Sequence, residues 1–501
     1  MRRGVMLLVL LTAALGVTGM STAAPAKTEA VIVLTTDATT LDPARVTVTN
    51  DTLVSYYFFD YLLWRTADGK VQPYLAESYR AINDTTWEFK LRKNVKFHNG
   101  EPLNAEAVKF TFDRVLNPDN KIPGRGQIAT IKEVKAVDEH TVHFITEKPD
   151  PVLATARVFR QPIIPPRYFK EKGEQEFARN PVGTGPYIFR EWVKDTRIVG
   201  EANPNYWGGV PRLRKITFRP IPEYATRVSL LRTGEVDIVP FVVPDQAAAL
   251  ARERGIKVST TPTLRTMFLI MRPDMAPLDK KAVRQALNYA VDKESIVKNL
   301  LGGYAVVSKA QVVAPIFFGF NPNMRPYPFD LERAKKLLVE AGYRDGFELS
   351  FYTPAGRYTL DKEIAEVIVA QFAKVGVRAK LTPMEWGVFA KAQLDFKFAQ
   401  LNLFAFAGPY DAGEVYNSLF ARGQPWGVGP YWTHPELERL LEVARTRVDP
   451  KVRTDAIHKA AAIIREEAPV LFMHHLVNIY AARDWVDFTP RPDDMILLYK
   501  K

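Results

Sequence analysis

Two glycines flank a threonine in the stretch NPVGTGPYIFREW, residues 180–192. Such a loop could bind a phosphate if it stood between a strand and the N-terminus of a helix, whose free N–H groups bind anions. The residues after Gly185 are aromatic and β-branched and are followed by the turn-like pair Lys194-Asp195, so they predict a β-hairpin. No Lys-Ser or Lys-Thr pair follows the second glycine. We therefore expect Gly183 and Gly185 to serve the backbone, letting the chain enter a strand through a tight turn.

Enzymatic chemistry finds little support in the remaining residue patterns. A serine hydrolase would need a nucleophile beside a base, and the sequence has no Gly-x-Ser-x-Gly. There is no cysteine, and none of the seven histidines stands in a His-Glu-x-x-His arrangement. We expect no catalytic residue, no protein-held metal and no cofactor. The alternative to a protein without catalytic activity is a periplasmic hydrolase. A turnover assay on peptides or esters would distinguish these two possibilities.

Aromatic residues gather after two expected strands in the second half of the chain. Trp386 follows a strand that ends near Leu381, and Phe404, Phe406 and Tyr410 mark the end of another strand. Ligands of α/β folds bind beyond the carboxyl ends of strands. Flat rings cover a ligand at little cost in rotamer entropy, so we predict that this group contacts the ligand. Each ring alone could equally be a core residue.

The element pattern predicts an α/β fold. Short strands dominate residues 31–265, including the alternating stretch TTWEFKLRKNVKF. After residue 279 helices dominate, with Asp279, Asp292 and Asp330 as expected N-caps. A strand, a helix and a strand follow one another between residues 347 and 381, which is typical of a parallel crossover unit.

The N-terminus reads as a secretory signal peptide, residues 1–26. Arg2 and Arg3 precede an apolar run, and Ala24-Pro25-Ala26 fits the small-residue cleavage rule. A retained membrane anchor is the alternative, although the run is shorter than the ~20 residues of a span. Without cysteine, lipid attachment at the N-terminus is impossible, so we expect a soluble protein in the periplasm.

The formal net charge is +12, yet lysines and arginines are scattered among acids and no block of five like charges occurs. We therefore expect a basic solvated surface, which could bias the ligand site toward anions, and no nucleic-acid partner.

Several longer segments, in order along the mature chain, resemble one family. They are LDPA (41–44), LAESYRAINDTTWEFKLRKNVKFHNGEPLNAEAVKFTFDRV, PVGTGPYIFREW with the residues up to EVDIV, VRQALNYAVDKESIV and DLERAKKLLVEAGY. Together they are similar to the extracellular solute-binding proteins, family 5, of peptide, nickel and opine ATP-binding-cassette importers.

The resemblance implies a hinged, type II-like periplasmic-binding-protein fold with two lobes and the ligand between them. It places lobe one at 27–265, with an extra domain at about 56–180, lobe two at 266–480, and a C-terminal return to lobe one at 481–501. It further implies no enzymatic activity, a small-molecule or short-peptide ligand, a membrane permease as partner, and a monomer.

Departures from the family pattern bear on the ligand. In the peptide branch an acid before an Asp-Pro pair holds the ligand's ammonium; here Asp411 matches the aspartate of the pair and Gly408 the earlier acid. Tyr410 and Asp411 resemble the nickel branch, but Gly413 stands where that branch has a histidine. These differences argue against a ligand with an ordinary peptide amino terminus and against nickel bound through that histidine. A nickel chelate stays an alternative ligand.

A second segment carries candidate cations. TARVFRQPIIP resembles a region where the nickel branch places an arginine against ligand carboxylates, so the resemblance offers Arg157 or Arg160 for that role. The plain alternative is a surface ion pair. We therefore predict a peptide-like or carboxylate-bearing ligand.

Overall fold

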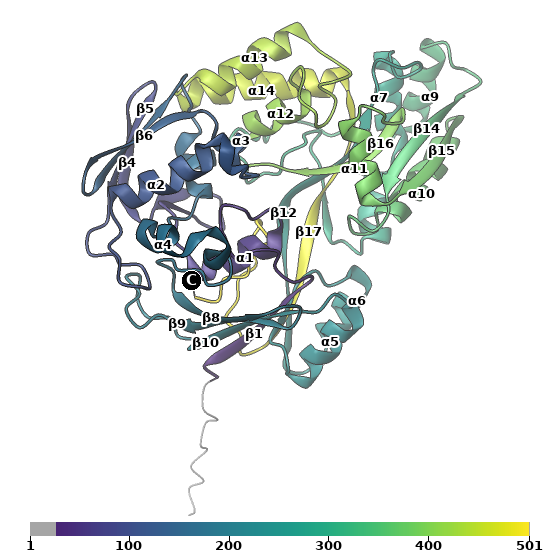
Figure 1. Cartoon of the computed structure of the whole chain (residues 1–501). Helices are drawn as coiled ribbons and strands as arrows, with labels where there is room; N and C mark the ends of the chain where they lie inside the picture. Colours follow the sequence, from purple (N-terminus) through teal and green to yellow (C-terminus); the bar gives the residue numbers. More distant parts are fainter. Residues whose placement is uncertain (1–26, 500–501) are drawn as a thin grey trace, which may run out of the picture.

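The computed structural model describes residues 27–499, so the expected signal peptide lies outside the described residues. Within this range the largest feature is a sheet of eleven strands that runs through the molecule. Its two longest strands, β12 (Ile256–Met271) and β17 (Val470–Arg483), pair antiparallel near the middle of the sheet. Both pass from one half of the molecule to the other (Figure 1).

The strands on one side of β12 and β17 come mostly from the first half of the chain. β1 (Glu29–Leu34) pairs parallel with β10 (Lys215–Pro220) and with β11 (Ile238–Val239), which in turn pairs with β17. The hairpin of β8 (Tyr187–Val193) and β9 (Arg197–Ala202) extends this edge and confirms the hairpin predicted after Gly185. The helices beside this part of the sheet in Figure 1 are α5 (Tyr224–Thr233) and α6 (Pro244–Leu250).

On the other side the sheet contains the predicted crossover unit. β14 (Phe347–Pro354) pairs parallel with β15 (Val377–Met384), and α10 (Asp361–Ala373) connects them, which confirms the α/β prediction. β14 also pairs parallel with β16 (Leu401–Ala407), whose other edge pairs antiparallel with β12.

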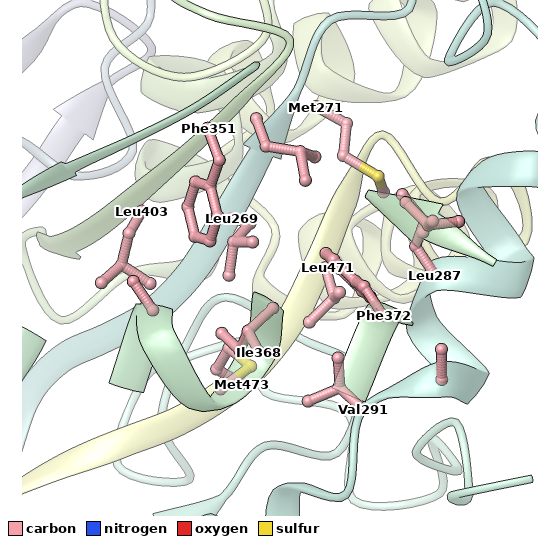
Figure 2. Close-up of a cluster of buried hydrophobic side chains, with 14 of the residues drawn as sticks. Leu269, Met271, Leu287, Val291, Phe351, Ile368, Phe372, Leu403, Leu471 and Met473 are labelled. Atoms are coloured by element: carbon pink, nitrogen blue, oxygen red, sulfur yellow. The ribbon is translucent and has the colours of Figure 1, made fainter. Parts of the chain in front are cut away.

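Apolar side chains of the long strands form the core of this half. Figure 2 shows Leu269 of β12 and Leu471 of β17 packed with Phe351 of β14 and Phe372 of α10, all without exposed surface. Removing these apolar side chains from water stabilises the packing of strands and helices by roughly 25 cal/mol per Å² of buried apolar surface.

A separate four-stranded sheet lies to one side of the main sheet, at the left of Figure 1. Its order is β4 (Ala76–Asn83), β5 (Thr86–Leu91), β7 (Thr141–Thr146) and β6 (Ile131–Asp138). Helix α2 (Ala105–Leu116) packs on it through Val108, Phe112 and Val115. Asn104 caps this helix, accepting a hydrogen bond from the Ala107 N–H at 3.0 Å.

Two of the three predicted aspartate caps are confirmed. Asp292 accepts from the Ser295 N–H and Asp330 from the Arg333 N–H, at 2.9 and 2.8 Å. Asp279 was the wrong residue, because α7 (Lys281–Ala290) begins two residues later and its N-cap, Lys280, makes no side-chain capping bond. Among residues 27–499, none of the helices has the length and hydropathy that crossing a bilayer would need.

The remaining elements complete the chain order. The helices are α1 (Thr49–Phe58), α3 (Arg125–Ile128), α4 (Pro166–Phe177), α8 (Lys293–Ser295), α9 (Leu331–Glu340), α11 (Trp386–Leu394), α12 (Ala412–Phe420), α13 (Pro435–Thr446) and α14 (Pro450–Glu467). The short strands are β2 (Leu63–Arg65), β3 (Val71–Pro73) and β13 (Ala305–Val307), and the short helical turns include η2 (Leu153–Arg157) and η3 (Val158–Arg160).

Gly183 and Gly185 are required for a reason that the sequence did not reveal. Neither residue has a positive φ, so an unusual turn conformation is not the cause. A Cβ at Gly183 would lie 2.1 Å from the carbonyl oxygen of Phe58, and one at Gly185 would lie 2.4 Å from the carbonyl carbon of Phe58. The Gly185 N–H donates to the same carbonyl oxygen at 3.0 Å. The glycines therefore allow two backbone segments to touch, and the segment that follows them is strand β8 rather than a helix.

Candidate functional site

Asp411 is engaged in holding its own helix. It is the N-cap of α12, and its Oδ1 accepts from the Glu414 N–H at 3.2 Å. Its Oδ2 accepts from Arg453 of α14 at 2.8 Å. Asp411 and Arg453 are each only 5% exposed. Both carboxylate oxygens of Asp411 therefore already have partners within the protein.

The two glycines that depart from the family pattern sit where a side chain does not fit. A Cβ at Gly408 would lie 2.4 Å from Cγ2 of Val415, which is itself buried. A Cβ at Gly413 would lie 3.1 Å from Oδ1 of Asp411 and 3.3 Å from Ala444 and Ile457. An acid at position 408 or a histidine at position 413 would require the neighbouring residues to shift.

The two candidate arginines have different surroundings, although they are only three residues apart. Arg157 donates to Asp150 at 3.2 Å and lies 2.8 Å from Glu414 of α12, so two carboxylates match its charge. Burial raises the pKa of Glu414, and Arg157 offsets part of that rise. Arg157 thus ties η2 to α12, as in the ion-pair alternative.

Arg160 has no carboxylate partner among residues 27–499. Its Nε donates to the carbonyl oxygen of Ala156 at 3.0 Å, and none of the hydrogen bonds in the described part of the chain uses its terminal nitrogens. Burial, together with the charges of Arg157 and Arg65, lowers the pKa of its guanidinium to about 10. Such a cation is stabilised by any anion that reaches it.

Arg160 lines a cavity of about 380 Å³. Other lining residues include Tyr56 and Tyr61, and also Gln161, which is 6% exposed and whose Oε1 has no partner in the described range. Buried polar atoms without partners are uncommon in native proteins and call for an explanation such as a ligand. The cavity therefore combines an unmatched cation with an unmatched acceptor.

Tyr410 closes over a neighbouring arginine. Its ring lies 4.2 Å from the guanidinium of Arg65, whose other face is covered by Phe159 at 4.3 Å. The Tyr410 ring also packs on Gly69, where an added Cβ would lie 2.7 Å from the ring. Its hydroxyl is buried without a hydrogen-bond partner within residues 27–499.

These groups form a cluster with a surplus of positive charge. Arg65, Arg157, Arg160 and Arg491 are the cations of this cluster, and Asp150, Glu414 and Asp493 are its carboxylates. Four guanidinium groups face three carboxylates, which leaves a net positive charge. The ion pairs use Arg157 and Arg491, so neither Arg65 nor Arg160 has a paired acid among residues 27–499. Sequence reasoning missed Arg65 and Arg491, because stacking on rings from distant segments leaves no local signal.

The other three aromatic residues predicted as ligand contacts, Trp386, Phe404 and Phe406, belong to a second group that does not include Tyr410. Trp386 starts α11 and is half-buried, with Arg357 4.8 Å above its ring and Tyr358 at 6.2 Å edge-on. Phe406 is half-buried and lies 6.3 Å from Phe404. Phe404 itself is 3% exposed and packs in a core cluster, so no contact with a ligand is assigned to it below.

Metal chemistry has no donor set in the described chain. No group of three or more histidine, cysteine or acidic side chains within residues 27–499 is arranged to hold an ion. His474 and His475 lie on opposite faces of β17; His475 shares a hydrogen bond of 2.8 Å with Thr266, and burial lowers its pKa to about 4.

Comparison with known proteins gives the relationship of the whole chain. Residues 70–426 match the profile of the bacterial extracellular solute-binding proteins, family 5 (middle region). The chain is 32% identical over 434 residues to a dipeptide-binding protein of Escherichia coli K12, covering 81% of each sequence. It is 31% identical over 500 residues to the glutathione-binding protein GsiB of Salmonella choleraesuis, covering 96% of each.

A solved structure shares the fold. It is the ABC transporter-associated periplasmic binding protein DppA of Helicobacter pylori in complex with the peptide STSA, which is 25% identical. The TM-score is 0.77, over 95% of this chain and 99% of that one. The α/β architecture is thus that of a periplasmic binding protein, and the protein is a binding protein rather than an enzyme. On the extent of these matches, the chain belongs to the bacterial extracellular solute-binding proteins, family 5.

Proposed function

We propose that this protein captures a peptide-like, carboxylate-bearing small molecule and delivers it to the membrane permease of an ABC importer. It acts as a monomer in the periplasm, after removal of the signal peptide 1–26. Support comes from its relatives, two of which are named for binding dipeptides and glutathione and one of which is called ABC transporter-associated and periplasmic. The ligands in these three names are all peptides or peptide-like.

The proposal includes two lobes that close over the ligand. Lobe one is 27–265, with the extra domain at about 56–180, lobe two is 266–480, and residues 481–501 return to lobe one. The long strands support this division, since Leu269 and Leu471 belong to one core cluster while Ile256 and Ala481 belong to another. The pairing of β12 and β17 also shifts register between Pro262 and Thr266, which supports a hinge there.

Arg160 is the single observation that carries the choice of ligand. A partly buried guanidinium that lacks a carboxylate partner costs free energy, and a ligand carboxylate would remove that cost through a paired, charge-assisted contact. The cavity beside it, of about 380 Å³, offers room for such a group. Arg157 is a weaker candidate, since Asp150 and Glu414 already match its charge. Trp386, Phe406 and Tyr410 are proposed as the aromatic walls of the binding region.

The experiment compares Arg160→Ala with a matched arginine change. Native mass spectrometry with an equimolar pool of dipeptides, tripeptides and glutathione identifies the bound species, and calorimetry then measures its affinity. Arg160→Ala should weaken binding by about 1.5–3 kcal/mol, the usual contribution of a hydrogen bond to a charged group. Arg167→Ala, which removes a 68% exposed side chain in the same half of the molecule, serves as the control.

Amidation of the ligand carboxylate gives the second half of this test. The amide should bind the unchanged protein as weakly as the acid binds Arg160→Ala, and the variant should not distinguish the two forms. Equal binding of the acid to both proteins would refute the role of Arg160. A pool from which nothing binds would refute the peptide-like ligand itself.

A further inference from the structure

Among residues 27–499, two groups of opposite charge form no ion pair where the C-terminal turn meets β12. Leu264 donates its N–H to the carbonyl oxygen of Pro492 at 3.2 Å, which brings residues 492–494 alongside Arg265. The Asp494 N–H donates to the carbonyl oxygen of Arg491 at 3.3 Å, and its φ of 66° places it in the left-handed region. The turn thus fixes Asp494 beside the strand that carries Arg265.

Asp494 has a neutral partner only. Its Oδ1 accepts a hydrogen bond from the amide of Asn478 on β17, and among residues 27–499 no cation lies within the 4.0 Å of an ion pair. Asn478 also donates to the hydroxyl of Tyr480 at 3.4 Å. Burial raises the pKa of Asp494, and the negative charge of Asp493 acts in the same direction. Within residues 27–499 this half-buried carboxylate therefore lacks the cation that a desolvated acid normally has.

Arg265 is the complementary group. In the described part of the chain its guanidinium takes part in no ion pair and no hydrogen bond, and the residue is half-buried. Its positive charge lowers the pKa of both Asp494 and Tyr358, so it lies near both without pairing with the acid. In the sheet, Arg265 is opposite Ala407, the last residue of β16.

The residue opposite Arg265, Ala407, adjoins the position at which the peptide branch of the family carries an acid. Ala407 precedes Gly408, where the peptide branch of the family has its ammonium-binding residue and where a side chain here would collide with Val415. Tyr358, whose hydroxyl donates to the carbonyl oxygen of Ala405 at 3.1 Å, connects Arg265 with Trp386. The C-terminal turn therefore brings an acid beside Arg265, near the end of β16 where Gly408 carries none.

We propose that Asp494 and Arg265 bind the amino-terminal head group of the ligand. The ammonium group lies against the Asp494 carboxylate, and the oxygen on the adjacent carbon, a carbonyl or a carboxylate, faces Arg265. The ligand class is thus a primary amine with a neighbouring oxygen acceptor, as in an α-amino acid or a peptide amino terminus. This inference rests on the proposed function, since it assigns the second end of the same peptide-like ligand.

The charges connect the head-group site with the cavity at Arg160. Asp493, the neighbour of Asp494 in the chain, pairs with Arg491, which donates to the carbonyl oxygen of Arg65 at 2.9 Å. Arg65 in turn stacks on Phe159, which lines the cavity. Tyr56 lines the cavity that Arg160 borders. An acidic end at Asp494 and a basic end at Arg160 would orient a zwitterionic ligand in one direction.

The test uses isosteric changes in the full mature protein. Asp494→Asn keeps the size of the side chain and an oxygen that can accept from Asn478, but it removes the charge. Asp484→Asn, an exposed aspartate just beyond β17, is the control. The same pool of dipeptides, tripeptides and glutathione is offered in free and in N-acetylated form, and Arg265→Gln is measured beside Asp494→Asn.

Asp494→Asn should weaken binding of the free amine at least tenfold and abolish the preference over the N-acetylated form. Arg265→Gln should weaken binding of the free amine, and Asp484→Asn should change nothing. Full affinity and full preference for the free amine in Asp494→Asn would overturn the proposal, as would N-acetylated ligands binding the unchanged protein equally well. If Arg160→Ala loses affinity in that case, the proposed function stands without this head-group site. If nothing in either pool binds the unchanged protein, both fall.

Discussion

Replacing Asp411 should destabilise the region of α12 and α14 without weakening ligand binding. Asp411 accepts from the Glu414 N–H as an N-cap and pairs with Arg453 at 2.8 Å, in a place where both residues are 5% exposed. Removing one member of a buried ion pair leaves the other charge unmatched, which typically costs about 3–5 kcal/mol. Arg453 retains a hydrogen bond to the carbonyl oxygen of Ala444, so part of the cost is relieved.

Two variants separate the two contributions. Asp411→Asn keeps a capping oxygen and loses the charge, so we expect a loss of about 2–4 kcal/mol in the free energy of unfolding. Asp411→Ala also loses the cap, which adds roughly 1 kcal/mol. For a lobe of this size the asparagine variant should melt roughly 4–16 °C lower.

The assay is urea and thermal unfolding of the mature protein, followed by calorimetry with the bound ligand. Asp455→Asn, an exposed change on the same helix as Arg453, is the control and should leave stability unchanged. Ligand affinity should stay within a factor of three in Asp411→Asn. A tenfold loss of affinity with normal unfolding would refute the assignment and return Asp411 to the ligand site.

Four further outcomes are expected. Trp386→Ala should weaken ligand binding by about 1–3 kcal/mol and remove a fluorescence change on binding; normal affinity with a lower melting temperature would make Trp386 a core residue. Gly69→Ala should cost at least 1 kcal/mol of stability, because its φ is 84° and the new Cβ would meet Tyr410 at 2.7 Å; unchanged melting would contradict that clash. The raised pKa of Asp494 means that the folded state binds its proton more tightly than the unfolded chain does. Asp494→Asn should therefore be more stable than the unchanged protein at pH 7, with a gap that closes as the pH falls toward 3.8, whereas a pH-independent gap would be evidence against burial of the charge. Finally, X-ray scattering should show compaction when ligand is added, and an unchanged curve at saturation would count against hinge closure.

The sequence by itself determined what depends on neighbours along the chain. The bounds of α13 (Pro435–Thr446) and α14 (Pro450–Glu467) can be read from the sequence, because apolar spacing and an N-cap are local properties. The crossover of β14, α10 and β15 was likewise readable from a change in periodicity. The family relationship also came from the order of the segments, since it needs no knowledge of contacts.

Only the tertiary structure decided which charged groups are left for a ligand. Arg157 and Arg160 are the same residue type three positions apart, and they differ because Glu414, more than 250 residues away, pairs with only one of them. Asp411 is matched by Arg453, whereas Asp494 forms no ion pair with any cation of residues 27–499. Gly183 and Gly185 are needed because Phe58 approaches them. All of these cases have the same physical reason. An ion pair or a close packing contact joins residues that are distant in sequence. The fold therefore decides whether a given residue has such a contact, and the local sequence pattern carries no sign of it.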